Sequence, residues 1–249
     1  MTTLPAGIRA VFFDAGLTLI YGKASLSDLC VRAAEQCGIT LAHEAVEVAL
    51  PGAAAQLHHA HRKDTDLWAS DAKVHRLWHE YYLYIFHQLG LAEQAEQCAK
   101  AVYASYSEPG AWCLFDDALP TLRALHERGY IVGVISDWAS NLTSGILLPL
   151  GVGRYIDFII VSTVQREGKP GWGLYREALA RAGVSPAEAV HIGDNYVNDV
   201  LGARSAGIYG IYLDRDDRHT APLDCLRLTT IQDIIPLLDE TTKRKDGGS

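Results

Sequence analysis

Residues 189–207 read AVHIGDNYVNDVLGARSAG, and this stretch contains a strand, a turn and a helix in succession. Ala189 to Ile192 is a short apolar run that ends at Gly193-Asp194, and such runs are typical of strands buried on both faces of a sheet. The stretch from Val197 to Ala206 is amphipathic and of helical length. A buried strand followed at once by a helix predicts the α/β class.

The same alternation extends to both sides of this unit. Further buried strands are predicted at Ala10–Phe13, Ile131–Ile135, Phe158–Val161 and Ile208–Leu213, and further amphipathic helices at Ala118–Arg128 and Leu174–Ala182. In the first of these helices Leu119, Leu122 and Leu125 keep helical spacing, and Gly129 suits the position that ends a helix. Strands that alternate with helices predict a Rossmann-like parallel sheet covered by helices.

One long segment breaks the alternation. From about Ser25 to Ser107 the pattern is helical only, with Ser25 and Asp66 as predicted helix starts. One apolar stripe consists of Leu77, Tyr81, Tyr84, Ile85 and Leu89. The aromatic residues of this segment suit helix–helix packing better than a ligand cage. We therefore predict two domains, an α/β catalytic core of residues 1–22 and 108–249 and an inserted helical cap of residues 23–107.

Composition and charge exclude several classes of partner. The chain has 249 residues and a formal net charge of −8, and its one basic block, Lys243-Arg244-Lys245, lies in a terminal stretch from Thr241 that we expect to fray. Nucleic acid and anionic membranes are therefore poor partners. The five cysteines are scattered, which favours free thiols over disulfides or zinc. Without a signal-peptide pattern or a spanning apolar run, we expect a soluble, cytoplasmic protein of open oligomeric state.

Polar residues follow two of the predicted strands and occupy one loop. Asp14 directly follows the first apolar run, Ser136-Asp137 follow the second, and Lys169 lies in a Gly-Lys-Pro loop. Ligands of open α/β sheets bind at the carboxyl ends of the strands, so these side chains are expected to share one crevice. There Asp14 could attack phosphorus or bind a cation, and Ser136 and Lys169 could hold a phosphoryl group. Taken alone, each residue suits a helix cap or a solvated loop at least as well.

Two more carboxylates flank the turn of the opening stretch. Asp194 ends the strand, and Asp199 lies near the start of the helix that follows. Hard oxygen ligands of this type suit Mg²⁺, which keeps several waters and takes few protein carboxylates. A solvated turn with a capping aspartate would carry the same residues, so this motif indicates a metal site only in combination with the other motifs.

Together these motifs resemble the haloacid dehalogenase superfamily over essentially the whole chain. The most specific part, Gly193 to Gly207, fits the pattern Gly-Asp-Asn-x-x-x-Asp-x-x-Gly-Ala-x-x-Ala-Gly. The position of the helical insert, between Asp14 and Ser136, resembles the C1-type cap of subfamily I, which includes haloacid dehalogenases and phosphoglycolate phosphatases. The resemblance implies a hydrolase, and specifically a phosphatase that takes a small phosphorylated metabolite as its substrate.

The resemblance also implies a role for each motif residue. The catalytic residues would be Asp14, as the nucleophile that forms an aspartyl phosphate, together with Ser136 and Lys169. The substrate-binding residues would be Ser136, Asp137 and Lys169. The Mg²⁺ ligands would be Asp14, the backbone carbonyl of Gly16, Asp194 and Asp199, the last through water or by orienting the site. Mg²⁺ and Lys169 would neutralise charge as one anion attacks another.

Gly16 departs from the family pattern, as does Leu17, which replaces the usual glycine. Most phosphatases of the superfamily have a second Asp two residues after the nucleophile, and its acid–base help is worth roughly 10²–10⁴-fold in rate. Asp137 is a candidate substitute, although a helix cap explains it more simply. Haloacid dehalogenases also lack the second Asp, but they lack the equivalent of Asp194 too. The open alternatives are a non-catalytic phosphate-ligand binding protein and a phosphonate C–P hydrolase using a cap lysine, namely Lys63, Lys73 or Lys100.

Overall fold

The computed structural model describes residues 3–64, 66–108, 110–220 and 223–246. The chain divides into two compact units, which we call the core and the cap. The core consists of Met1–Tyr21 and Leu114–Ser249, and the cap of Gly22–Cys113. The short strands β2 (Ile20–Gly22) and β3 (Trp112–Leu114) pair with each other where the chain passes between the units.

The core is built on a six-stranded sheet in which every pair of neighbours is parallel, in the order β5-β4-β1-β6-β7-β8. The strands are β1 (Ala10–Phe13), β4 (Ile131–Ser136), β5 (Phe158–Val161), β6 (Ala189–Gly193), β7 (Tyr209–Leu213) and β8 (Leu226–Leu228). The five strands predicted from apolar runs are confirmed. The prediction missed β8, because a three-residue Leu-Arg-Leu strand is too short to show a period.

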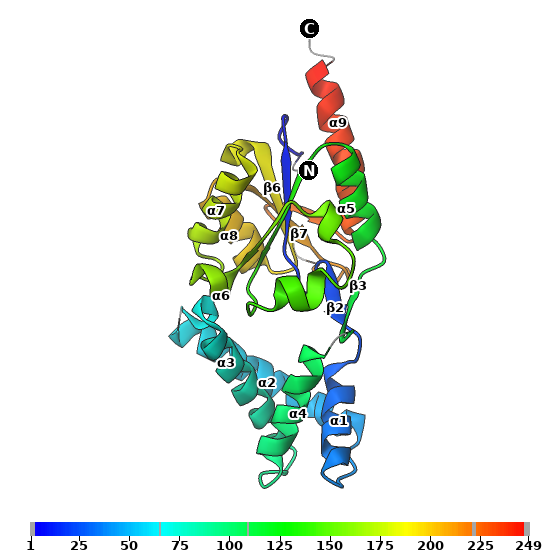
Figure 1. Cartoon of the computed structure of the whole chain (residues 1–249), viewed down its shortest axis with the longest axis vertical. Coiled ribbons are helices and arrows are strands. Elements are labelled where there is room, and N and C mark those ends of the chain that lie inside the picture. Colours follow the sequence, from blue (N-terminus) through cyan, green and yellow to red (C-terminus); the bar gives the residue numbers. More distant parts are fainter. Residues whose placement is uncertain (1–2, 65, 109, 221–222, 247–249) are drawn as a thin grey trace. The chain divides into compact units, whose positions relative to one another are not determined.

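Helices cover both faces of this sheet, with α5 and α9 on one side and α7 and α8 on the other (Figure 1). The α-helices are α5 (Ala118–Glu127), α6 (Ser162–Gln165), α7 (Trp172–Ala182), α8 (Gly202–Ser205) and α9 (Ile234–Asp246). The single-turn elements are η2 (Leu142–Leu147), η3 (Gly153–Tyr155), η4 (Pro186–Glu188), η5 (Tyr196–Leu201) and η6 (Ile231–Asp233). The helix predicted from Val197 to Ala206 thus consists of a π-helical turn, η5, followed by α8.

The end of the chain corrects one prediction. The fraying was expected from Thr241 to Ser249; residues 241–246 belong to α9 instead, and residues 247–249 lie outside the described residues. Ile234, Leu238 and Thr241 follow the spacing of one helix face and are all buried. Packing of this face therefore orders the helix as far as Thr241, where the terminal position suggested fraying.

Two aromatic rings and a glycine set the packing at the centre of the sheet. Phe12 of β1 and Phe158 of β5 lie with ring centroids 5.7 Å apart, on either side of β4. Gly133 of β4 leaves the space between them, since a Cβ there would lie 2.5 Å from Phe158 Cε2. This packing holds β1, which carries Asp14 at its end, in the middle of the core.

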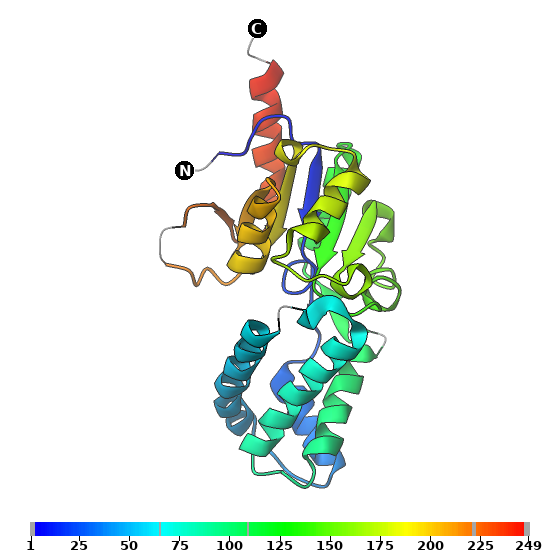
Figure 2. The same cartoon turned by 90° about the vertical axis from the view of Figure 1, so that its left-hand side faces the viewer.

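The cap is helical, as predicted (Figure 2). Its helices are α1 (Leu26–Gln36), α2 (His43–Lys63), η1 (Leu67–Ala69), α3 (Asp71–Gln88) and α4 (Ala95–Ser107). Ser25 caps α1 through a capping box with Asp28, which confirms that start. Asp66 precedes only the short η1, and the hydroxyl of Ser70 caps α3 instead. Tyr82 and Phe86 are buried in the cap core, so the aromatic residues serve packing.

Two further findings concern the helices and the cysteines. Within the described ranges, the longer helices are too polar or too short to cross a bilayer. All five cysteines are free thiols, as the scattered spacing predicted.

Candidate active site

Three neighbouring strands of the core lead into polar residues. Asp14 directly follows β1, Ser136 is the last residue of β4, and Asp194 directly follows β6. β1 lies between β4 and β6 and all three are parallel, so these residues lie at one edge of the sheet. The amide of Asp14 donates to the carbonyl of Ile192 at 2.9 Å, which extends the pairing of β1 with β6 and fixes the backbone at Asp14.

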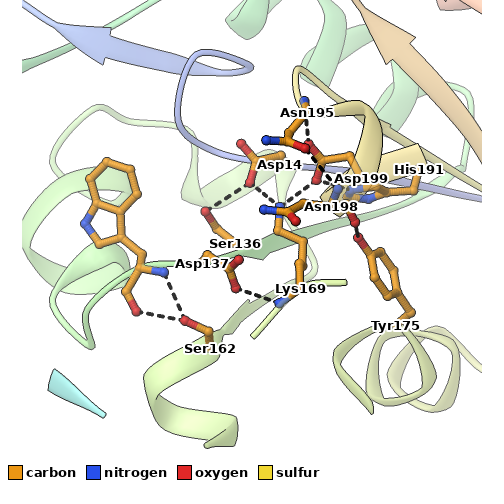
Figure 3. A network of polar contacts seen from close by, with 11 residues as sticks. Asp14, Ser136, Asp137, Ser162, Lys169, Tyr175, His191, Asn195, Asn198 and Asp199 are labelled. Atoms are coloured by element: carbon orange, nitrogen blue, oxygen red, sulfur yellow. Dashed lines mark hydrogen bonds and ion pairs between the residues drawn. The ribbon is translucent and has the colours of Figure 1, made fainter. Parts of the chain in front are cut away.

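Lys169 connects the separate motifs (Figure 3). Its Nζ lies 2.6 Å from Oδ1 of Asp14 and 2.6 Å from Oδ1 of Asp199. The hydroxyl of Ser136 donates to the same Oδ1 of Asp14 at 3.2 Å. Because both of these contacts end on Oδ1, the second oxygen of Asp14 is the one suited to attack or to a cation. The structure therefore brings together four residues that lie in separate motifs of the sequence.

Asp199 is buried and held by three donors. Besides Lys169, Nε2 of His191 lies 3.1 Å from its Oδ1, and the amide of Asn195 donates to its Oδ2 at 3.0 Å. A Cβ on Gly193 would lie 2.2 Å from the carboxyl carbon of Asp199, so only glycine leaves room for this carboxylate at the end of β6. Asp199 is thus a fixed part of the site, which explains why a Gly-Asp turn precedes it.

Asp137 supports the loop that carries Lys169. Its Oδ1 accepts a hydrogen bond from the amide of Lys169 at 2.9 Å, while its Oδ2 is buried without a partner among the described residues. The next residue, Trp138, is held through its backbone by Ser162: the Ser162 hydroxyl accepts from the Trp138 amide at 3.1 Å and lies 3.3 Å from its carbonyl oxygen. The observed contact of Asp137 is with the loop, and its contact with a substrate stays a prediction.

The buried charges shift one another's pKa values. Burial raises the pKa of Asp14, and Lys169 offsets only part of this. Burial, with the charges of Asp14 and Asp199, raises the pKa of Asp194 to about 7. Burial opposes ionisation of Asp199 as well, but Lys169 and His191 outweigh it and hold the pKa of Asp199 below its ordinary value. Burial would lower the pKa of Lys169, yet its two carboxylate partners hold that pKa well above the ordinary value.

The donor set fits a hard divalent cation. Asp14, Asp194 and Asp199 bring three carboxylates close to the buried Lys169, and additional positive charge would favour ionisation of the first two. Across the described ranges, no three His, Cys, Asp or Glu side chains form a ready cage for a metal ion. Mg²⁺ does not need one, because it binds through one or two carboxylates and keeps several waters. The predicted carbonyl ligand of Gly16 follows Asp14 in the same loop.

Gly16 lies against an aromatic ring of the core. A Cβ on Gly16 would lie 3.0 Å from Cζ3 of Trp138, closer than the roughly 3.5–4.0 Å at which carbon atoms pack. The left-handed backbone of this loop falls on Leu17, with a φ of 56°, and not on Gly16. The ring of Trp138 rather than the backbone therefore opposes a side chain at position 16.

Three residues without a role predicted from the sequence lie around Asp199 and Gly16, namely His191, Tyr175 and Trp138. The ring of Tyr175 packs edge-on against that of His191, with ring centroids 5.1 Å apart, and its hydroxyl donates a hydrogen bond to the carbonyl of Asn198 at 2.6 Å. A histidine inside an otherwise apolar strand was a usable signal for His191. The sequence carries no comparable signal for Trp138, whose contact is with a residue 122 positions earlier.

The cap lysines of the phosphonate alternative have ordinary surroundings. Lys73 forms an ion pair with Asp64 at 3.1 Å, and Lys100 forms one with Glu96 at 2.8 Å. Lys63 is exposed. These surroundings are those of ordinary lysines on a helix surface.

Comparison with known proteins decides the family. Residues 8–207 match the model of the haloacid dehalogenase-like hydrolases. The chain belongs to this family. The haloacid dehalogenase-like hydrolase domain-containing protein 3 of Danio rerio is 30% identical over 246 residues, which cover 95% of this chain and 96% of that protein. The phosphoserine phosphatase of Thermus thermophilus is 31% identical over 133 residues, which cover 53% of this chain and 52% of that protein.

Solved structures of the haloacid dehalogenase-like hydrolases share the fold. A dehalogenase solved with an intermediate complex has a TM-score of 0.70 and 22% sequence identity, covering 94% of this chain and 99% of that chain. At this identity the likeness shows the fold alone. The predicted Rossmann-like parallel sheet with flanking helices is therefore confirmed as the haloacid dehalogenase-like fold.

Proposed function

We propose that this haloacid dehalogenase-like hydrolase is a Mg²⁺-dependent phosphatase that forms an aspartyl phosphate at Asp14 on a small phosphorylated metabolite. The observation that carries the proposal is the contact of Lys169 with both Asp14 and Asp199, beside a further carboxylate at Asp194. Dehalogenases of the superfamily work without a metal and lack an aspartate at the position of Asp194. The phosphatase relative described above supports the same choice.

The reaction takes two displacements at phosphorus. A carboxylate oxygen of Asp14 attacks, the bond from phosphorus to the leaving oxygen breaks with its electron pair on that oxygen, and the oxygen takes up a proton. Water then attacks the aspartyl phosphate, loses a proton, and releases inorganic phosphate and free Asp14. Two steps of this kind are each easier than direct hydrolysis. Mg²⁺, when bound, supplies positive charge that offsets the repulsion between the two anions.

The protein's own groups prepare Asp14 for this task. Because burial raises the pKa of Asp14, its ionised form depends on neighbouring positive charge, and the Lys169 ammonium supplies it at 2.6 Å. The Ser136 hydroxyl, 3.2 Å from the same oxygen, keeps the carboxylate in one orientation. The two donors are also placed to hold a phosphoryl group brought up to Asp14.

The test compares phosphate release by wild type, Asp14→Asn and Asp194→Ala over a panel of small phosphate esters. Asp14→Asn should abolish release while circular dichroism shows an intact fold, and Asp194→Ala should weaken Mg²⁺ binding measured by titration calorimetry. Asp239→Asn is the matched control and should leave phosphate release unchanged. Asp239 lies on the surface of the α/β core unit, where it pairs with Arg128.

Each possible outcome assigns a part of the mechanism. Phosphate release that survives Asp14→Asn would remove the nucleophile assignment, and full activity in a chelator would remove Mg²⁺. Wild type that binds inorganic phosphate with Mg²⁺ yet releases none from any ester would instead identify a non-catalytic phosphate-ligand binding protein.

A further inference from the structure

The ring of Trp138 takes the space that a side chain at position 16 would need. The 3.0 Å distance from its Cζ3 to a Cβ at Gly16 is less than the separation at which two carbon atoms pack. The backbone of Trp138 cannot give way easily, because Ser162 contacts both its amide and its carbonyl. Ser162 is itself fully buried at the start of α6. A side chain at position 16 therefore requires the indole ring to shift by a few tenths of an ångström.

The role of position 16 in related phosphatases indicates which part of a substrate the Trp138 ring would face. In the phosphatases that this chain resembles, the side chain at this position protonates the leaving oxygen, so it lies on the leaving-group side of the nucleophile. A ring in contact with that place borders the leaving group of a substrate bound at Asp14. The site thus has a flat apolar surface where related phosphatases have an acid.

An aromatic ring in place of an acid has two chemical consequences. Without an acid, the leaving oxygen departs as an anion and is protonated by solvent afterwards. This favours substrates whose leaving hydroxyl group is acidic, because its anion is stable. A half-buried indole also offers a stacking surface, and an aromatic pair of this kind is worth roughly two- to tenfold in binding. Both requirements are met by a phosphate ester of an aromatic hydroxyl group.

We propose that Trp138 is the specificity-determining residue of this site and that it selects aryl phosphates by standing in the place of the missing acid. The proposal rests on the proposed function, because it takes Asp14 as the nucleophile. The bond from phosphorus to the aryl oxygen breaks with its electron pair on that oxygen, and water supplies the proton. Since position 16 also lacks a base for the second step, water attacks slowly and phosphorylated Asp14 accumulates.

The first experiment measures the wild type. With Mg²⁺ and 4-nitrophenyl phosphate, rapid mixing should show a burst of nitrophenol close to one equivalent of enzyme, followed by slower turnover. Glycerol 3-phosphate, whose alcohol is a poor leaving group, should be hydrolysed at least roughly a hundredfold more slowly. Loss of the burst in Asp14→Asn shows that the proposed function holds, independently of Trp138.

The second experiment separates the ring from the acid with four variants. Gly16→Asp alone should gain little on glycerol 3-phosphate, whereas Gly16→Asp with Trp138→Ala gives the carboxyl room and should gain roughly tenfold or more over Gly16→Asp. Trp138→Leu keeps apolar volume without a flat ring, so it should raise KM for 4-nitrophenyl phosphate roughly two- to tenfold and leave KM for glycerol 3-phosphate unchanged. Gly145→Asp is the matched control, since its Cβ would meet only Asn141 at ordinary contact distance.

The results distinguish the inference from the function on which it rests. A burst that depends on Asp14, combined with equal rates on aryl and alkyl phosphates, keeps the function and overturns the role of Trp138. The role of Trp138 is also overturned if the single variant Gly16→Asp hydrolyses glycerol 3-phosphate as fast as the double variant. If the double variant Gly16→Asp with Trp138→Ala unfolds, the KM values of Trp138→Leu and Trp138→Phe for 4-nitrophenyl phosphate decide, because only Phe keeps a stacking surface.

Discussion

Replacing Lys169 by Met tests how far the buried carboxylates depend on one cation. Nζ of Lys169 lies 2.6 Å from both Asp14 and Asp199, and its side chain is 3% exposed. Methionine keeps most of the apolar stem and leaves two buried carboxylates without their partner, which costs about 3–5 kcal/mol. Proton uptake gives a similar limit, because neutralising one carboxyl of pKa 3.8 at pH 7 costs about 4 kcal/mol.

The cost of Lys169→Met should depend on pH. Burial opposes ionisation of Asp199, but Lys169 and His191 outweigh it and hold its pKa below the ordinary 3.8. A carboxyl with a lowered pKa contributes stability above its unfolded-state pKa, and this stability is lost as the pH falls through the folded-state pKa. The variant lacks much of this contribution. Without Lys169, burial raises the pKa of the Asp199 carboxyl, which therefore takes up a proton in the folded variant as the pH falls. The deficit against wild type should be largest at neutral pH and should narrow as the pH falls from 7 to about 4.

The assay is urea unfolding in chelator at pH 7 and about pH 4, with hydrogen exchange of β1 and β6 peptides to follow the core separately from the cap. Lys73→Met is the matched control, because it breaks the partly exposed pair with Asp64 and should cost far less. A deficit for Lys169→Met below about 1 kcal/mol at pH 7, or an equal deficit at both pH values, would refute this reasoning.

Three further predictions concern single positions. Burial raises the pKa of Asp137 to about 7, so its ionisation weakens the folded state between about pH 4 and pH 7, and the stability of Asp137→Asn relative to wild type should rise across this window. Urea midpoints that shift equally at pH 4 and pH 8 would contradict this. Leu17 has a φ of 56° and is 59% exposed, so Leu17→Gly should stabilise by up to about 1 kcal/mol, whereas Leu148→Gly, at φ −64°, should destabilise. Thermal melts in which both variants lose stability equally would show that the φ of Leu17 carries no strain. Gly133→Ala places its Cβ 2.5 Å from Phe158 Cε2 and should cost about 1–3 kcal/mol in urea unfolding, and an unchanged midpoint would mean that the ring moves freely.

The sequence by itself determined the elements whose cause is local. Short apolar runs flanked by turn residues indicated five strands of the sheet, because a strand buried on both faces must be apolar along its whole length. Ser25 was identifiable as a helix start from its own side chain and that of Asp28 three residues later. Parallel strands also imply a shared carboxyl edge, so Asp14, Ser136 and Asp194 could be expected near one another before their distances were known.

Only the tertiary structure decided which groups touch. Lys169 contacts Asp14 across 155 residues of sequence. Asp137 holds the loop that carries Lys169, and no periodic pattern in the sequence reveals where the Asp137 side chain points. The same holds for Trp138 against Gly16. The order of α9 likewise depends on packing rather than on its own composition. Periodicity and side-chain chemistry act over a few residues, whereas each of these contacts depends on where the folded chain returns to itself, which no local pattern encodes.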